Sequence, residues 1–565
     1  MKALPPELWD IIIRLLNHNH QRKFLLLSRK LHAIVFPLLF HHVNLHFGPW
    51  SPDVNQRMDE GERWKLNIRT EEILWEISTR PTFAAAIRAV TVQAFLASGH
   101  NADRVFEIQL LLRALRALSP SLYSLRWFEF ANRPLPASWV LPTVAGLMGA
   151  NLLELHLPIT CLTHPALGAF TNLRRFELDI GPDGDLQASS DSHMDLIDES
   201  DLEKVRQTVF RNRTTLDHLV APGALIWRLP SRTFEGLHTL EITCTATVDG
   251  LGVTLLHCKA IRDFSLMYSG PDDGLETIVG QLSVHKLPLL TAFKIVFKEP
   301  FEEGTFIHFH ILCALAGFLR GRTELRRLHV QPAYLPPEAG EDASSPLADV
   351  IPTLPNLTTL GLEFKYPLCL DRLDLLEKLI PRGITALRLD CSLNPGANAL
   401  YEQAFLSILR GLPSVRYLHI FNEIDGESPL KDQLREDPPP ALDLLGFGPF
   451  VRWLVPSPDL TVESLPEWSP RWPLWKLRFR AERDFGNADW AWLMRHRLPC
   501  DGNESERDLL SSPRRCRRTD AGLTSPLVRA RANYVVLRTT RAWCVVHCSQ
   551  PRAGSSSRWY DIDVL

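Results

Sequence analysis

The 565-residue sequence predicts an α/β fold that has three parts: a short N-terminal helical module, an irregular solenoid of strands and helices, and a C-terminal extension. Two observations carry this prediction. Apolar residues recur at helical spacing over the first forty residues, and a six-residue pattern (apolar, two variable, apolar, one variable, apolar) then recurs along most of the chain. We place the parts at 1–45 for the module, 46–82 for a connector with one helix, 83–480 for the solenoid, and 481–565 for an extension that is poorly ordered after about residue 500.

The N-terminal module contains two short predicted helices. Pro5 and Pro6 fit a first helical turn, where the missing N–H groups have no intrahelical partner. The first helix carries its apolar residues on one face: Leu8, Ile11, Ile12 and Leu15. The second carries Leu27, Leu31 and Val35, and we expect Pro37 to end it. Because each helix is too short to be stable alone, the module must pack against the rest of the chain or against a partner.

The string L-P-P-E-L-W-D-I-I at residues 4–12, followed by L-L-S-R-K-L at 26–31 and P-L-L-F at 37–40, resembles an F-box. The resemblance implies docking on a Skp-type adaptor within a cullin–RING ubiquitin ligase. The residues that it assigns to the adaptor are Leu4, Pro5, Leu8, Ile11, Ile12, Leu15, Leu27, Ser28, Leu31, Pro37 and Leu38. One departure is the segment 17–23, which is shorter than the usual inter-helix segment and could loosen the second helix.

The connector contains one predicted helix, from Thr70 to Ser78, with Thr70 as its N-cap and Glu71 and Glu72 in its first turn. Beyond it, the six-residue pattern predicts short strands whose fourth and sixth positions point to one interior. Copies are Ile87/Val90/Val92, Leu122/Leu125/Trp127, Leu152/Leu155/Leu157, Leu173/Phe176/Leu178, Leu237/Leu240/Ile242, Ile261/Phe264/Leu266, Leu290/Phe293/Ile295, Leu325/Leu328/Val330, Leu357/Leu360/Leu362, Ile384/Leu387/Leu389, Val415/Leu418/Ile420 and, more distantly, Leu474/Leu477/Phe479.

Amphipathic segments such as 202–210, 373–380 and 405–412 lie between these copies. Strand and helix alternating at this spacing is similar to a leucine-rich-repeat horseshoe, although the Asn or Cys expected after each strand is mostly replaced. An ordinary α/β domain remains the alternative. Two segments, 181–201 and 331–348, are predicted to be solvated surface loops because they are rich in acidic residues or proline.

Composition limits the classes of function. The net charge of −3 gives no support for general nucleic-acid binding. The longest uncharged run, 134–153, contains Pro142 and two glycines, so we expect a repeat helix that leads into a strand and no membrane span. The start of the chain has no secretory signal pattern, and ten cysteines without close pairs fit reduced thiols, so we expect a cytoplasmic or nuclear protein.

No catalytic motif stands out. The sequence contains no Walker-type phosphate loop, no H-E-x-x-H and no G-x-S-x-G. Histidine groups at 18/20, 41/42/46 and 308/310 lack further ligands at recognised spacings, so we expect no metal and no cofactor.

The variable positions of the repeats face the concave side of a horseshoe, where partners bind. In the C-terminal half they are basic with interleaved aromatics, and they are Arg326, Arg327, His329, Arg388, Arg416, Tyr417 and His419. Such a surface suits a protein substrate with an acidic or phosphorylated segment, because arginine makes bidentate hydrogen bonds to carboxylates and phosphates. Alternatively, these residues only solvate an exposed sheet.

The sequence therefore favours a non-enzymatic substrate-recognition subunit of a Skp–cullin–F-box ubiquitin ligase, with protein partners and no small-molecule substrate. The main alternative is a leucine-rich interaction scaffold whose N-terminal helices only cap the solenoid. A cap would bury Leu4, Leu8 and Ile12 against the first repeats, whereas an adaptor-binding module would leave them exposed. A hydrolase or transferase would instead require a deep pocket lined by titratable side chains.

Overall fold

The computed structural model describes residues 4–16, 18–47, 60–94, 104–129, 137–162, 164–179, 199–245, 247–270, 272–283, 285–297, 307–334, 345–364, 373–391, 399–421, 429–448, 450–455, 467–469, 487–495, 537–539 and 542–544. The chain divides into two units, 1–503 and 504–565. In the second unit, the described residues form one antiparallel pair of strands, β17 (Leu537–Thr539) and β18 (Ala542–Cys544).

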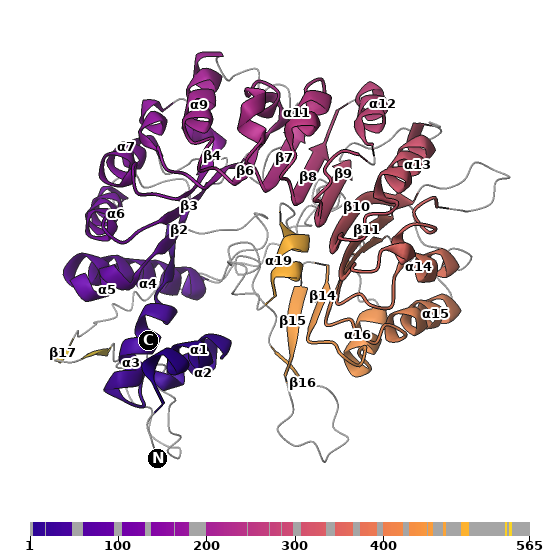
Figure 1. Cartoon of the computed structure of the whole chain (residues 1–565). Helices are drawn as coiled ribbons and strands as arrows, with labels where there is room; N and C mark the ends of the chain where they lie inside the picture. The colour runs from indigo at the N-terminus through magenta and orange to yellow at the C-terminus, as the bar shows by residue number, and fades with distance from the viewer. Residues whose placement is uncertain are drawn as a thin grey trace, which may run out of the picture. The chain divides into compact units, whose positions relative to one another are not determined.

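The first unit is built on one sixteen-stranded sheet whose strands follow each other in sequence order (Figure 1). Neighbouring strands are parallel from β1 to β14, and β15 and β16 then pair antiparallel. The strands are β1 (His42–Phe47), β2 (Ala89–Ala94), β3 (Ser124–Glu129), β4 (Glu154–Pro158), β5 (Arg175–Asp179), β6 (His218–Pro222), β7 (Thr239–Thr245), β8 (Asp263–Tyr268), β9 (Ala292–Phe297), β10 (Arg327–Tyr334), β11 (Thr359–Phe364), β12 (Ala386–Cys391), β13 (Tyr417–Phe421), β14 (Leu444–Phe447), β15 (Phe450–Val455) and β16 (Glu467–Trp468).

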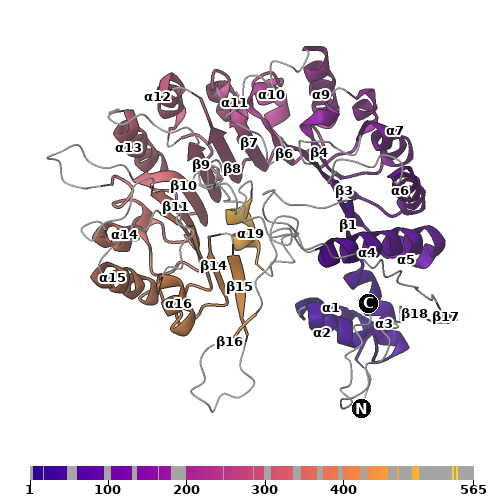
Figure 2. The same ribbon diagram turned by 180° about the vertical axis from the view of Figure 1, so that it is seen from behind.

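Helices α4 to α16 lie between the strands in the chain and on the outer side of this curved sheet, whereas α19 lies on its inner side (Figures 1 and 2). Helices α1 to α3 precede β1. The helices are α1 (Pro6–Leu15), α2 (His18–Phe24), α3 (Arg29–Leu39), α4 (Glu60–Thr79), α5 (Pro81–Ala86), α6 (Arg104–Leu118), α7 (Ala137–Met148), α9 (Glu199–Arg211), α10 (Gly223–Ile226), α11 (Leu251–His257), α12 (Asp272–Gln281), α13 (Ile307–Leu319), α14 (Leu373–Leu379), α15 (Ala399–Arg410), α16 (Pro429–Glu436) and α19 (Ala488–Met494). Four 3-10 turns add to them: η1 (Ile159–Cys161), η2 (Pro165–Ala169), η3 (Ser231–Phe234) and η4 (Ile351–Thr353).

The repeating apolar pattern explains the core. In the eleven copies that lie on described strands, none of the apolar side chains is more than 3% exposed. Equivalent positions pair in register across neighbouring strands, as Leu360 does with Leu387 and Leu387 with Leu418. The core is therefore a continuous stack of apolar layers, and the mostly parallel sheet with alternating helices is compatible with the predicted α/β solenoid. The twelfth copy, at Leu474, lies outside the described residues.

Three of the parallel strands, β1, β6 and β14, lie on none of the predicted copies, and neither do the antiparallel strands β15 to β18. In β6 the last apolar position is Ala221, which is too small to stand out in the pattern, yet it is fully buried. At β14 the pattern is complete, because Leu442, Leu445 and Phe447 occupy its three apolar positions and all are buried. β1 pairs with β2, so the sheet already begins at His42, before residue 83 where the solenoid was predicted to start.

The predicted connector therefore belongs to the first repeat. Its helix α4 begins at Glu60, so Thr70 lies inside the helix and is not its N-cap. The buried Thr70 hydroxyl instead accepts a hydrogen bond from the His46 N–H at 2.9 Å and so ties α4 to β1. Part of the predicted loop 331–348 is also ordered: 331–334 extends β10, and Leu347 is fully buried. Among the described residues, none of the helices is both long and apolar enough to span a membrane.

The Asn or Cys expected after each strand would satisfy backbone hydrogen-bonding groups in the turns, and here other groups satisfy them in two ways. At each strand entrance, one carbonyl accepts two N–H groups of the next repeat, as the Tyr123 oxygen does from Leu153 and Glu154 at 2.8 and 3.0 Å. Elsewhere single side chains serve: the buried Asn212 accepts a hydrogen bond from the Leu173 N–H at 2.7 Å and donates to the Phe170 and Thr208 carbonyls. The backbone groups of irregular turns are thereby satisfied, as burial requires.

Candidate functional site

The N-terminal module has a small core of its own, formed by Ile13 of α1 and by Val35 and Leu39 of α3. α1 begins as predicted, with Pro5 as N-cap and Pro6 at the first helical position. α3 differs from the prediction, because Pro37 lies inside its last turn and does not end the helix. The helix begins after Ser28, whose hydroxyl accepts a hydrogen bond from the Leu31 N–H at 3.2 Å.

The opposite side of α1 is apolar and exposed. Leu8 is 45% exposed, Ile11 55% and Ile12 37%, and Leu4, one turn before Leu8, is 45% exposed. Residues three and four positions apart are neighbours on a helix, so Leu8, Ile11 and Ile12 share one side of α1, and Leu4 lies two residues before the helix begins. We call Leu4, Leu8, Ile11 and Ile12 the α1 surface. An apolar surface of this kind marks an interaction site more often than a solvated helix face.

The other residues assigned to the adaptor are divided between exposed and packed positions. Leu27 and Pro37 are exposed, as are Pro5 and Ser28, whereas Leu31 and Leu38 are half-buried against the core of the module. The side chain of Leu15 lies outside the described residues. Leu26, which the sequence analysis did not select, is 83% exposed in the turn between α2 and α3.

The short segment between the two predicted helices forms a third helix, α2. Its Gln21 side chain donates hydrogen bonds to the carbonyls of Ile13 and Leu16, at 2.9 and 3.0 Å. These carbonyls lie at the end of α1, where intrahelical donors are missing. The shortened segment thus caps the end of α1 through Gln21.

The module joins the solenoid through α3. The rings of Phe36 and Phe40 meet the ring of Phe83 on α5 edge-on, with centroid distances of 6.0 and 5.1 Å. The solenoid therefore packs on α3 and leaves the α1 surface exposed.

The second candidate surface is the inner side of the sheet, which presents the side chains at positions three and five of the repeats. We call it the concave face. In its C-terminal half it is covered by α19, which packs on β11 and β12. Trp490, Trp492 and Leu493 are at most 2% exposed, and they lie against an apolar group made of Ala292, Ala386, Tyr417, Leu444 and Val451.

Polar contacts surround this apolar group. At the start of α19, Asp489 forms an ion pair with Arg327 at 2.7 Å. At its end, the Arg388 guanidinium donates to the Leu493 carbonyl at 3.0 Å, and the Lys294 ammonium donates to the Arg495 carbonyl at 2.7 Å.

Further along the sheet, the Trp492 indole N–H donates to Asp263 at 3.2 Å, and Arg495 forms ion pairs with Glu241 and Asp263. α19 thus reaches strands from β7 to β13.

The residues predicted to bind substrate occupy two environments. His329, Arg388, Tyr417 and His419 are at most 3% exposed. Arg326 and Arg416 lie just before their strands and are exposed, and Arg416 forms an ion pair with Asp443 at 2.5 Å. The basic and aromatic character of the face is therefore present, but most of the face is not open to solvent.

Close packing fixes the imidazoles on this face. A Cβ atom at Gly361 or Gly446 would lie 2.1 or 2.5 Å from the rings of His329 and His419, so only glycine fits beside them. His419 stacks between Phe421 and Trp490, with centroid distances of 4.1 and 6.4 Å. Burial, and then the nearby Arg388 charge, lower the pKa of His419 to about 3, so this ring is neutral at physiological pH.

The N-terminal half of the concave face carries a cluster of charges around Glu177 of β5. The carboxylate contacts Arg175, His156 at 2.6 Å, His218 at 3.3 Å and Arg126 at 3.5 Å. Burial alone would raise the pKa of Glu177, but Arg175 and Arg126 hold it well below its usual range. The charges of this cluster compensate each other. In the sequence, the one indication of this charge cluster was Glu177 itself, an acidic residue at the fifth position of its repeat.

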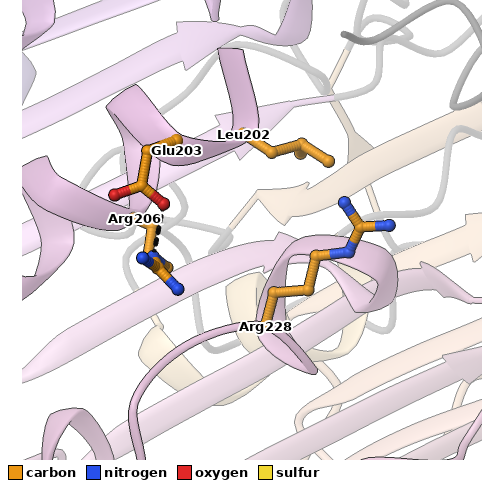
Figure 3. A pocket seen from close by; sticks show the side chains of 4 residues that line it. All are labelled: Leu202, Glu203, Arg206 and Arg228. Carbon is orange, nitrogen blue, oxygen red and sulfur yellow. Dashed lines mark ion pairs between the residues drawn. The ribbon is translucent and has the colours of Figure 1, made fainter. Parts of the chain in front are cut away.

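One surface hollow, of about 460 Å³, lies at α9 and is lined by Leu202, Glu203, Arg206 and Arg228 (Figure 3). Arg206 and Glu203 form an ion pair at 2.7 Å along the helix surface, which is a common arrangement on a solvated helix. Within the described ranges, no three His, Cys, Asp or Glu residues are placed to hold a metal ion.

Comparison with known proteins adds no relative to this picture: neither a scan against protein-family models nor a search of curated proteins finds a match.

Proposed function

We propose that this protein is the substrate-recognition subunit of a Skp–cullin–F-box ubiquitin ligase, which binds the Skp-type adaptor through its N-terminal module and a protein substrate through the solenoid. The observation that carries the proposal is the exposed α1 surface. It supports the F-box resemblance because Leu4, Leu8, Ile11 and Ile12, four of the residues that the motif assigns to the adaptor, are available for contact.

The exposures also argue against the alternative of a capping module. A cap would bury Leu4, Leu8 and Ile12 against the first repeats, yet all three are at least 37% exposed. The contacts with α5 come from α3 instead. Burying a fully exposed Leu or Ile side chain stabilises a complex by roughly 1.5–3 kcal/mol, so four such residues, already partly buried, can supply several kcal/mol of adaptor binding.

The solenoid supports the second half of the proposal. Its core is continuous from β1 to β14, so a substrate held on it keeps a fixed position relative to the adaptor. A subunit of this kind accelerates ubiquitin transfer through proximity and contributes no catalytic group. Arg326 and Arg416 are the exposed members of the predicted basic set, and they suit contact with an acidic or phosphorylated segment.

The test is co-expression with a Skp-type adaptor and measurement of the affinity. Leu8→Asp combined with Ile11→Asp places two charges on the α1 surface, and we expect the affinity to fall at least 100-fold. The matched control is Val253→Asp combined with Leu256→Asp on α11. These residues are also three positions apart on a helix and are both 59% exposed, so the control adds the same two negative charges at similarly exposed apolar positions.

We expect the control to bind the adaptor like the wild type, and both variants to unfold at the wild-type denaturant concentration. Equal adaptor binding by the two double variants would contradict the proposed role of the α1 surface. A folded wild type that does not bind at all would favour the leucine-rich scaffold.

A further inference from the structure

The segment that covers the concave face is not a repeat of the solenoid. α19 follows the last described strand of the sheet, and the contacts of α19 and of Arg495 just after it reach residues up to 254 positions away in the chain. It has only seven residues, which is too short for a helix that is stable in isolation. Its helical structure therefore depends on the face that it covers.

The concave face contacts both the backbone at the C-terminal end of α19 and specific side chains along the helix. Two cations, Arg388 and Lys294, donate to carbonyls at its C-terminal end, where the helix dipole is negative. These two contacts involve only backbone atoms of α19, so any helix that ends at the same place could make them. The remaining contacts select side chains.

The side-chain contacts define a sequence preference. Arg327 pairs with an acidic residue in the first turn, Asp489. His419 stacks on Trp490, and Asp263 accepts from the indole of Trp492.

Beyond the helix, a basic residue, Arg495, pairs with Glu241. The contacts at both ends give the face a direction, so it can distinguish one orientation of a bound helix from the other.

The composition of the covered face is that of a surface and not of a core. Lys294, Arg388, Glu241 and His419 are all at most 3% exposed. Such residues are rarely buried unless they are paired. The segment made of α19 and Arg495 supplies partners to Lys294, Arg388 and Glu241. His419 stacks on Trp490 and is hydrogen-bonded to the Gly448 carbonyl of the solenoid itself. If α19 left, water would hydrate these groups, so the vacated face would hold no unsatisfied buried charge.

We propose that the C-terminal half of the concave face is a peptide-binding site, and that α19 is an internal ligand that occupies it. The ligand from a partner is a short helix with an acidic residue in its first turn, two tryptophans or similar aromatics at the positions of Trp490 and Trp492, and a basic residue after its end. The inference rests on the proposed function in one respect, which is that the ligand from a partner is a ubiquitin-ligase substrate. It narrows the expected substrate from a protein with an acidic segment to one with a short helix that carries acidic and aromatic residues.

The experiment uses the full chain and a fluorescent synthetic peptide with the sequence Asn487–Arg495. In the wild type the site is occupied, so the peptide binds weakly. Trp490→Ala combined with Trp492→Ala weakens the internal ligand, and we expect at least tenfold tighter peptide binding. Trp75→Ala is the control, because Trp75 on α4 is 50% exposed and far along the chain from α19. We expect it to bind the peptide like the wild type.

A receptor-side substitution completes the design. Adding Arg388→Met to the double variant removes the donor to the helix end, and we expect peptide affinity to fall at least tenfold again. If the double variant unfolds cooperatively but binds the peptide no better than the wild type does, α19 is a permanent cover and the proposal is overturned.

A milder variant guards against misfolding. Asp489→Arg places two like charges where Asp489 and Arg327 form an ion pair, and since these side chains are 27% and 26% exposed, the change does not disturb a core. We expect it to raise peptide affinity at least threefold, and unchanged affinity would overturn the proposal.

Adaptor binding measured on the same samples separates this inference from the proposed function. The Leu8→Asp, Ile11→Asp change affects the adaptor alone, and the tryptophan changes affect the peptide alone.

Discussion

The α1 surface and the C-terminal half of the concave face are the two candidate binding surfaces of this chain. The α1 surface is exposed to solvent, whereas the concave face is covered by α19 of the same chain. The α1 surface has Leu and Ile side chains that are 37–55% exposed, whereas on the concave face Trp490, Trp492 and Leu493 of α19 are at most 2% exposed. Exposure alone therefore does not identify the candidate interaction sites of this fold. One site is marked by apolar residues in solvent, and the other by charged residues buried under a helix.

The difference in burial between the two regions is tested most directly by truncating one apolar side chain in each. We expect Trp492→Ala to weaken the docking of α19 by about 3–5 kcal/mol, because a large buried side chain and its hydrogen bond to Asp263 are lost. Leu8→Ala should change the free energy of unfolding by less than about 0.5 kcal/mol, since it is a surface substitution. Hydrogen exchange of the α19 amides and urea unfolding measure the two quantities. Similar effects from both substitutions would show that the α1 surface is packed in solution.

Acidification sharpens the comparison, because His419 is buried on the concave face. Its folded-state pKa is about 3 and its unfolded value is near 6.5, so between these pH values the unfolded chain binds more protons. Stability from this residue is therefore fully present above pH 6.5 and falls by about 1.4 kcal/mol per pH unit as the pH drops below it.

His419→Gln keeps a donor for the Gly448 carbonyl, which lies 2.8 Å from the His419 ring nitrogen, but does not titrate. Urea unfolding at pH 7.0 and 5.5 should show a loss that is about 1 kcal/mol smaller in this variant than in the wild type. The same pH dependence in both proteins would show that His419 is accessible to solvent.

The smallest effect belongs to the exposed part of the predicted basic set. Arg416 forms an ion pair with Asp443, and the two side chains are 55% and 41% exposed. Such pairs contribute at most about 1 kcal/mol, so Arg416→Ala should change stability little. A larger loss in urea unfolding would mean that this edge of the sheet is covered like the rest of the concave face.

The sequence could predict the repeats because burial is local in a solenoid: each apolar triplet identifies its own strand, and eleven of them lie on the strands expected. It missed β6 because Ala221 carries too little apolar surface to complete the triplet, and it placed Thr70 at a helix start because a cap and a buried mid-helix threonine look alike in sequence.

The position of α19 over the concave face could not be predicted from local sequence patterns. The contacts of α19 and of Arg495 just after it join residues up to 254 positions apart, and no periodicity links Arg495 to Glu241. A signal for the helix itself existed, because Asn487 is a good N-cap and accepts from the N–H groups of Asp489 and Trp490. What the helix covers could be read only from the structure. The adaptor that the N-terminal motif implies stays a prediction.

The most direct test of the account is hydrogen exchange of the full chain with and without a Skp-type adaptor. The account predicts slower exchange in the peptides that cover α1 and the turn at Leu26, and no change in β10 to β13 or α19. Slower exchange confined to the concave face, or no change in α1 when the adaptor is present in excess, would contradict it.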